Sequence, residues 1–102
     1  KEIETYLGTH PNIAEVYVVG VPNDFYGEEV VAFIRRQTGS TLSGEDIKSY
    51  CKGKLASNKI PEYIIFVERF PLSATGKVLK KKLRQMAAGM KTQLGQEVYS
   101  NI

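Results

Sequence analysis

Three runs of β-branched and aromatic residues are the feature that most limits how this chain can fold. They occupy residues 14–21 (AEVYVVGV), 29–36 (EVVAFIRR) and 63–67 (YIIFV). Residues of these types favour strands, and Pro22, Asn23 and Asp24 are expected to end the first one. Apolar residues of this density need helices over at least one side of the sheet. Because residues 63–67 are almost wholly apolar, we predict that they form the central strand.

Amphipathic segments around these runs predict the helices. Residues 2–9 place Ile3 and Leu7 on one face. Ser43 is a favourable N-cap for a second helix that ends near Ala56, because Pro61 prevents its continuation. A third helix is predicted from about Val78 to Ala88. The order helix, strand, strand, helix, strand, loop, helix predicts an α+β fold, in which a small mixed β-sheet is covered by amphipathic helices in two layers.

Composition fits one small domain and excludes several classes of protein. The 102 residues are enough for a single core, and no apolar run reaches the ~18 residues that a membrane span needs. The chain has one cysteine, Cys51, and one histidine, His10. A zinc site or a Ser-His-Asp triad built within this chain is therefore not expected. Cys51 lies on the apolar stripe of the second helix and is expected to be a buried, unreactive thiol.

The net charge of +3 is unevenly distributed. From Lys77 to Lys91 the chain carries lysine and arginine but no acidic residue. This bias favours an anionic partner, such as a phosphate-bearing ligand, a nucleic acid or an acidic protein face. The tyrosines, which stack on bases in some nucleic-acid-binding proteins, are spread among predicted strands and helices, and no nucleic-acid-binding motif is present. One open interpretation is therefore a free-standing basic α+β module that binds an anionic partner such as nucleic acid.

Residues 71–77 (PLSATGK) predict an exposed loop that presents Lys77 at the start of a basic helix. Pro71 cannot donate to a strand ladder, and small residues follow it. The segment is not a phosphate-binding P-loop. That motif has glycine where this chain has Pro71, and serine or threonine where it has Val78.

Three separated motifs together resemble a known family. They are GVPNDFYGEEVVAFI (20–34), CKGKLASNKIPEYIIFV (51–67) and PLSATGKVLKKKL (71–83). In this order they resemble the C-terminal domain of the adenylate-forming (AMP-binding) enzymes, and most closely acyl-CoA synthetases acting on medium-chain or related carboxylic acids. The resemblance extends to about Ala88. It implies a domain over residues 1–88, followed by a tail at 89–102.

The resemblance implies that Lys77 takes part in catalysis. Such enzymes join a carboxylic acid to ATP, form an acyl-adenylate, and then transfer the acyl group to coenzyme A (CoA). Lys77 matches the catalytic lysine of the adenylation step, and Thr75 and Gly76 match the loop beside substrate and nucleotide. A second face is expected to bind CoA during thioester formation. Its residues, by resemblance, are Tyr26, Gly27, Lys52, Lys54, Asn58 and Lys59.

The resemblance also implies groups outside this chain. The sequence begins at Lys1 rather than methionine, and we expect it to be an excised fragment that is inactive alone. A large N-terminal domain would supply the hinge, the Mg²⁺-binding acid and the acyl pocket, with no metal held by this fragment. The expected partners are that domain, ATP or acyl-adenylate, CoA and a fatty acid, and not a nucleic acid. The expected location is the cytoplasm, or the mitochondrial matrix in a eukaryote.

Overall fold

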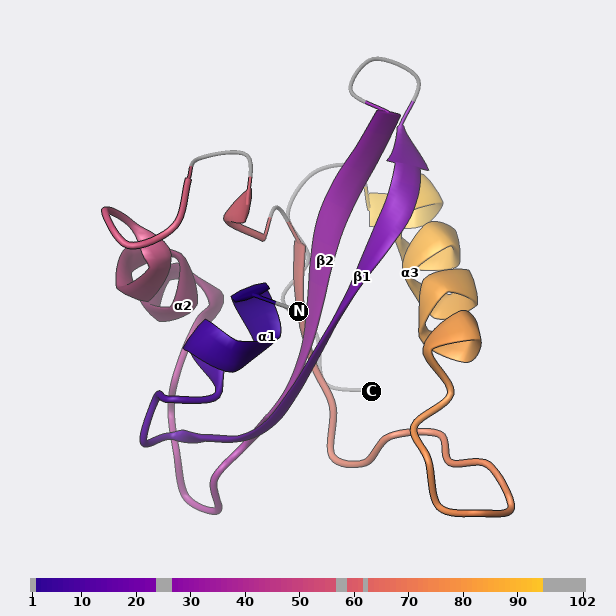
Figure 1. Ribbon diagram of the computed structural model, residues 1–102, viewed down its shortest axis with the longest axis horizontal. Coiled ribbons are helices and arrows are strands. Elements are labelled where there is room, and N and C mark those ends of the chain that lie inside the picture. Colours follow the sequence, from indigo (N-terminus) through magenta and orange to yellow (C-terminus); the bar gives the residue numbers. More distant parts are fainter. Residues whose placement is uncertain (1, 24–26, 57–58, 62, 95–102) are drawn as a thin grey trace.

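A computed structural model describes residues 2–23, 27–56, 59–61 and 63–94. The elements follow the order predicted from the sequence (Figure 1). They are α1 (Glu2–Leu7), β1 (Ile13–Asn23), β2 (Gly27–Arg36), α2 (Gly44–Cys51), β3 (Tyr63–Phe66) and α3 (Lys80–Leu94). The predicted α+β class with a small mixed sheet is confirmed. Within the described ranges, no helix combines the length and the apolarity that crossing a membrane requires.

The three strands form one sheet in the order β1–β2–β3. β1 and β2 pair antiparallel, whereas β2 and β3 pair parallel from Val31 opposite Tyr63 to Ile34 opposite Phe66. β2 is therefore the central strand, and the prediction that residues 63–67 are central is wrong. Apolar side chains on both faces are typical of a central strand. β3 carries them at the edge of the sheet because helices cover both faces.

β1 also continues further than the sequence predicted. Pro22 pairs with Glu28 and Asn23 pairs with Gly27, so these two residues extend the strand instead of ending it. β1 lies at an edge of the sheet, where proline is tolerated because its missing N–H can face away from the partner strand. The third expected breaker, Asp24, lies outside the described residues.

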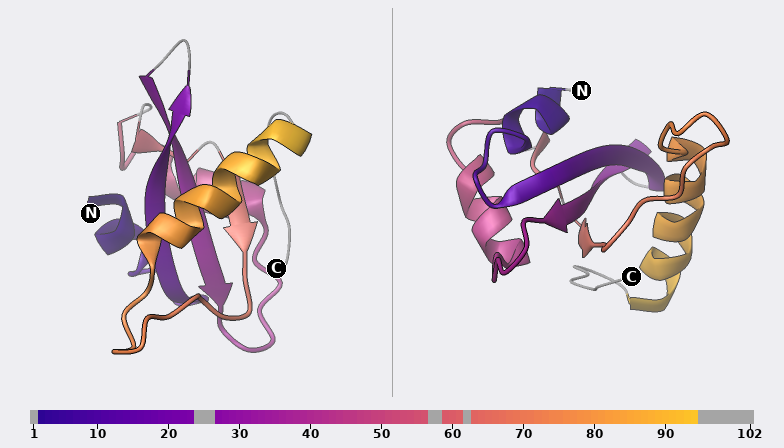
Figure 2. Two further views of the ribbon diagram at one scale, coloured as in Figure 1. Left: turned by 90° about the vertical axis from the view of Figure 1, so that its right-hand side faces the viewer. Right: turned by 90° about the horizontal axis from the view of Figure 1, so that it is seen from below.

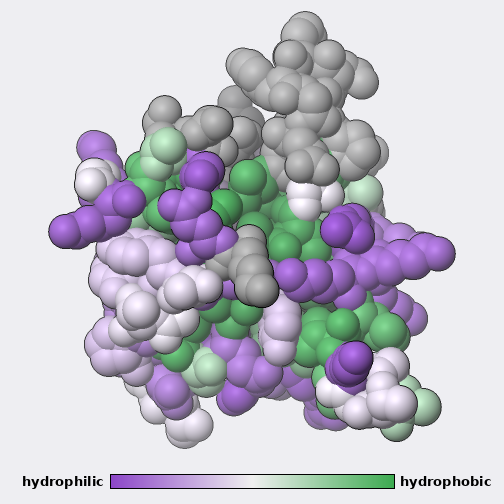
Figure 3. All heavy atoms as spheres, viewed as in Figure 1, coloured by the Kyte–Doolittle hydropathy of each residue, from purple (hydrophilic) through white to green (hydrophobic). Residues whose placement is uncertain are grey.

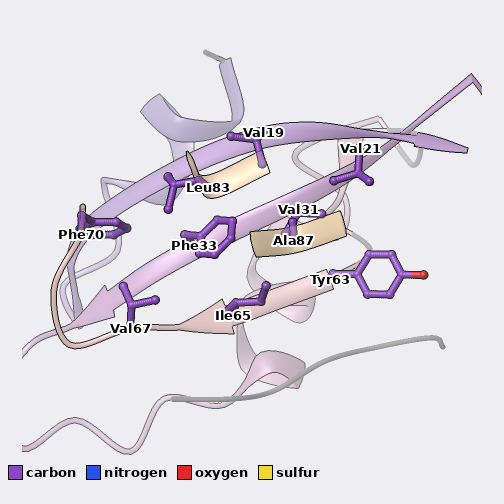
Figure 4. Close-up of a cluster of buried hydrophobic side chains, with 10 residues drawn as sticks. All are labelled: Val19, Val21, Val31, Phe33, Tyr63, Ile65, Val67, Phe70, Leu83 and Ala87. Carbon is purple, nitrogen blue, oxygen red and sulfur yellow. The ribbon is translucent and has the colours of Figure 1, made fainter. Parts of the chain in front are cut away.

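Side chains of the sheet enter two separate cores. β2 alone contributes Val31 and Phe33 to one core, and Ala32 and Ile34 to the other. The first core lies under α3 (Figure 4) and consists of Val19, Val21, Val31, Phe33, Tyr63, Ile65, Val67, Phe70, Leu83 and Ala87. The second lies under α1 and α2 and consists of Ile3, Leu7, Ile13, Ala32, Ile34, Leu42, Ile47, Cys51, Ile64 and Phe66. Figure 2 shows the sheet between α3 and the other two helices, so there are three layers rather than the expected two.

α2 ends at Cys51, before the predicted end near Ala56. Lys52 has an extended backbone (φ −63°, ψ 127°), and its N–H donates to carbonyl groups of the last helical turn. Gly53 follows with φ +82°, a left-handed conformation that terminates helices. Cys51 is completely buried, as predicted, and burial raises the pKa of its thiol.

α3 begins at Lys80, two residues later than predicted, and extends past Ala88 to Leu94. Val78 does not belong to the helix, because it pairs with Leu72 in an isolated antiparallel β-bridge. The segment before α3 is therefore a loop with strand-like pairing of its own.

The capping box of α2 generates a stability prediction. Ser43 Oγ accepts the Asp46 N–H at 3.1 Å, and Asp46 Oδ2 accepts the Ser43 N–H at 2.9 Å. Ser43→Ala removes one of these hydrogen bonds, so it should lower the free energy of unfolding by about 1 kcal/mol. Urea denaturation of the chain measures this. Ser49→Ala, at an exposed position of the same helix, is the matched control; an equal loss in both variants would contradict a specific role for the cap.

Candidate functional site

Residues 71–79, here called the Lys77 loop, fold back as a short antiparallel hairpin. Besides the β-bridge described above, the Ser73 N–H donates to the Lys77 carbonyl oxygen at 2.8 Å. The Leu79 N–H donates to the Pro71 carbonyl oxygen at 3.0 Å. The loop thus has a regular backbone although it lies outside the sheet.

Ser73 organises the tip of the Lys77 loop. Its carbonyl oxygen accepts the Gly76 N–H at 3.0 Å and closes a β-turn. Its Oγ accepts the N–H groups of Thr75 and Lys77, each at 3.3 Å, and lies 2.9 Å from Thr75 Oγ1. Gly76 has φ +86°, a conformation that favours glycine. The tip is therefore held by its own hydrogen bonds.

Lys77 is exposed on this loop, as are Thr75 and Gly76. Within the described residues, no carboxylate forms an ion pair with Lys77. Figure 1 shows the Lys77 loop at the lower right, projecting away from the sheet. Figure 3 shows hydrophilic side chains extending from the α3 side of the molecule. The Lys77 side chain is therefore available to a group outside this chain.

Both ends of the Lys77 loop are attached to the body through β1. Before the loop, the buried Phe70 ring packs edge-on against Tyr17, with centroids 4.9 Å apart. After the loop, Lys80 Nζ donates to Glu4 Oε2 at 2.6 Å. The Val18 N–H of β1 donates to the same oxygen at 2.7 Å. The loop is thus anchored at its two ends and exposed at its tip.

Glu4 is the charged residue on which the second attachment depends. Burial raises the pKa of Glu4, but the hydrogen bonds from Lys80 and Val18 and the charge of Lys80 outweigh burial, so the pKa lies below its ordinary value. The carboxylate is therefore ionised at neutral pH. Sequence reasoning did not identify Glu4. Its position beside Ile3, on the inward side of α1, was the available signal.

Among the predicted CoA-binding residues, Gly27 lies away from the Lys77 loop. Gly27 is the first residue of β2 and pairs with Asn23 at the end of β1. Figure 1 shows this end of the two strands at the top, at the opposite end of the sheet from the Lys77 loop. Tyr26 and Asn58 lie outside the described residues. The structure therefore does not bring all of the predicted residues into one cluster.

The three lysines of the predicted CoA-binding surface are exposed. Lys52 and Lys54 follow α2, and the Lys54 N–H donates to the Cys51 carbonyl oxygen at 3.0 Å. Lys59 Nζ donates to Glu2 Oε1, and this hydrogen bond and the charge of Lys59 lower the pKa of Glu2. In the described part of the chain, Lys52 and Lys54 have no acidic partner, whereas Lys59 has one.

A shallow groove of about 670 Å³ lies beside Lys54. It is lined by Glu2, Thr5, Tyr6, Thr9, Lys54 and Leu55. Tyr6 stacks on Tyr50 with ring centroids 4.8 Å apart, and its hydroxyl donates to the Tyr50 carbonyl oxygen at 2.7 Å. The groove therefore has a fixed aromatic wall, which the sequence did not reveal. In the described ranges, no group of His, Cys, Asp and Glu is arranged to hold a metal ion.

Comparison with known proteins identifies the family. The family described as AMP-binding enzyme C-terminal domain matches residues 2–77. The mitochondrial medium-chain acyl-CoA ligase ACSF2 of Danio rerio is 54% identical over 84 residues, which are 82% of this chain and 14% of that protein. The chain therefore spans only a small part of the curated relatives that it matches.

Solved structures of larger enzymes contain the same fold. Apo MatB from Rhodopseudomonas palustris superimposes with a TM-score of 0.83 at 35% identity, covering 87% of this chain and 18% of that one. A Mycobacterium tuberculosis fatty acyl CoA synthetase gives a TM-score of 0.77 at 35% identity, with the same two coverages. From the family match and these likenesses, the chain belongs to the AMP-binding enzyme C-terminal domain family.

Proposed function

We propose that this chain is the mobile C-terminal domain of an AMP-forming acyl-CoA synthetase and that Lys77 is its catalytic lysine. The observation that carries the proposal is the presentation of Lys77. It is exposed on a loop braced by its own hydrogen bonds, and no described carboxylate pairs with it. Membership of the family gives this arrangement its chemical context. The fragment alone is inactive, because the site that Lys77 completes belongs to a larger domain.

The chemistry of adenylation requires a cation of this kind. A carboxylate attacks the α-phosphate of ATP and forms an acyl-adenylate and pyrophosphate. Two anions approach one another, and further negative charge develops on the phosphate oxygens during attack. A lysine fits this task because its ammonium group is a compact charge on a long stem. A cation positioned before the reaction stabilises the transition state without reorganising. Thr75 and Gly76 hold the backbone beside Lys77 near substrate and nucleotide.

The second half-reaction uses another part of the domain. CoA attacks the acyl-adenylate, a thioester forms, and AMP leaves. We assign the CoA-binding surface to Gly27, Lys52, Lys54 and Lys59, together with Tyr26 and Asn58. The exposed Lys52 and Lys54 are suited to the phosphates of CoA, because no described acidic group neutralises them. The position of Gly27, at the opposite end of the sheet from the Lys77 loop, supports alternate presentation of two faces.

The remaining components lie outside this chain. ATP and CoA are co-substrates, and Mg²⁺ is expected to be held by the large domain. We propose a medium-chain carboxylic acid as substrate, because the Danio rerio relative is named a medium-chain acyl-CoA ligase. A panel of carboxylic acids of increasing chain length, tested on the full-length protein, would identify it. The same name supports a mitochondrial location if the source is eukaryotic.

Removal of Lys77 should separate the two half-reactions. In the full-length protein, Lys77→Ala should slow adenylation by about 100- to 1,000-fold, the typical effect of removing one preorganised stabilising group. Thioester formation from a supplied acyl-adenylate should be retained. Carboxylate-dependent pyrophosphate release measures the first step, and consumption of free CoA thiol measures the second. Lys82→Ala removes the same charge from an exposed position on α3 and is the matched control. Equal loss of both half-reactions would contradict the assignment.

Changes in the proposed CoA-binding surface should impair the use of CoA and leave adenylation unaffected. The double variant Lys52→Ala, Lys54→Ala should raise the KM for CoA by about 10-fold, because contacts of exposed lysines contribute up to about 1 kcal/mol each and a total of about 1.4 kcal/mol corresponds to tenfold. Pyrophosphate release should be unchanged. Steady-state kinetics with varied CoA, beside the Lys82→Ala control, measures the effect. An unaltered KM for CoA would remove these lysines from the proposed surface.

A further inference from the structure

One carboxylate oxygen connects three elements of the fold. Oε2 of Glu4, on α1, accepts the Val18 N–H of β1 at 2.7 Å and the Lys80 ammonium of α3 at 2.6 Å. The side chain of Glu4 is 19% exposed and that of Lys80 is 42% exposed. The right-hand view of Figure 2 shows α1 and α3 on opposite sides of the sheet. The pair therefore joins two helices that cover opposite faces of the sheet.

This contact occurs at the edge of the sheet. β1 has β2 on one side, so an N–H on its other side needs a different acceptor. Glu4 supplies that acceptor to Val18, and Lys80 reaches past the strand to neutralise the carboxylate. Removing either charge would leave the other partly buried without its partner. Loss of either partner should therefore cost more free energy here than at an exposed surface ion pair.

Helix stability does not explain a lysine at this position. The first turn of α3 contains no acidic residue, although negative charge is favoured at a helix N-terminus and positive charge is disfavoured there. The next two residues, Lys81 and Lys82, are exposed. Among these three lysines, Lys80 has an ion pair with a described carboxylate.

The pair lies next to the Lys77 loop. Lys80 follows the loop directly, and the hydrogen bonds of the loop tip are made within the loop. Those bonds determine the shape of the tip, but they cannot determine its angle to the sheet. That angle depends on the attachments of the loop to the body, which are Phe70 before it, the partly buried Val78 packed against the core under α3, and the Glu4–Lys80 pair after it.

We propose that Glu4 and Lys80 form a positioning pair that sets the direction in which Lys77 projects from the domain. This inference rests on the proposed function, in which Lys77 acts in adenylation. Neither residue touches substrate; both act through the loop. Because a displacement of about 1 Å can slow a reaction by about 100-fold, an anchor directly beside the loop controls the rate of that step.

The test uses the full-length protein, five single variants and one double variant. Lys80→Met removes the ammonium group and keeps an unbranched stem, whereas Lys80→Arg keeps a cation that can bind the carboxylate. Glu4→Gln removes the charge and keeps an oxygen for the Val18 N–H. Lys82→Met is the matched control, because it removes the same charge from an exposed position in the same helical turn. Lys77→Ala and the Glu4→Gln, Lys80→Met double variant are measured in parallel.

We expect Lys80→Met and Glu4→Gln to lower kcat for pyrophosphate release by between about 10-fold and 100-fold. The KM for ATP and thioester formation from supplied acyl-adenylate should remain close to those of the parent protein. Lys80→Arg should retain most adenylation activity, and Lys82→Met all of it. The double variant should be no slower than the worse single variant, because the two residues act as one unit.

Two results would overturn the positioning pair while the proposed function stands. In the first, Lys77→Ala is impaired in adenylation but Lys80→Met behaves as Lys82→Met does. In the second, Lys80→Met lowers both half-reactions in parallel with the thermal unfolding temperature, which indicates a structural role alone. If Lys77→Ala itself retains full adenylation, the proposed function fails and the positioning pair fails with it.

Discussion

The whole fold depends on the burial of β2 on both of its faces. Val31 and Phe33 enter the core under α3, while Ala32 and Ile34 enter the core under α1 and α2, and none of the four is more than 1% exposed. A strand that buries both faces must be covered by helices on both sides. Its neighbours β1 and β3 provide the backbone partners along its edges. Among the described residues, charged groups are consequently excluded from the two cores.

This restriction is consistent with the positions of Lys77 and Gly27, which lie at opposite ends of the sheet. The Lys77 loop follows the strands at one end, and the paired residues Asn23 of β1 and Gly27 of β2 lie at the other (Figure 1). A close-packed interior transmits displacement and does not deform freely, so such a domain moves as a unit. In the proposed function, rotation of the unit about a hinge outside this chain would therefore be sufficient to exchange one end for the other at the partner domain. The two proposed half-reactions need no rearrangement within the domain itself.

Local patterns predicted the elements, but not their long-range arrangement. Runs of β-branched residues predicted the strands, and Ser43 predicted the start of α2, because both signals depend on neighbours in sequence. The order of the strands in the sheet could not be predicted from these local patterns. The apolar pattern of residues 63–67 is the same for a central strand as for an edge strand that is covered on both faces. Leu79 has helical spacing with Leu83, yet its N–H donates to Pro71 and keeps it in the loop. Its carbonyl accepts the Leu83 N–H at 3.2 Å, so Leu79 precedes the helix, although leucine is rarely an N-cap.

In the candidate site, too, sequence patterns predicted the features that depend on neighbouring residues and missed the one that depends on distant residues. A short motif containing Gly76 and Lys77 predicted the exposed loop, and Ser73 holds its tip locally. No sequence pattern linked Glu4 to Lys80, because 76 positions separate them. A partly buried ion pair of this kind contributes little net stability, since the desolvation of both charges offsets their attraction. The proposed contribution of the pair is to the position of Lys77 and not to the stability of the fold. A cation stabilises developing charge most effectively when its position is set before the reaction begins.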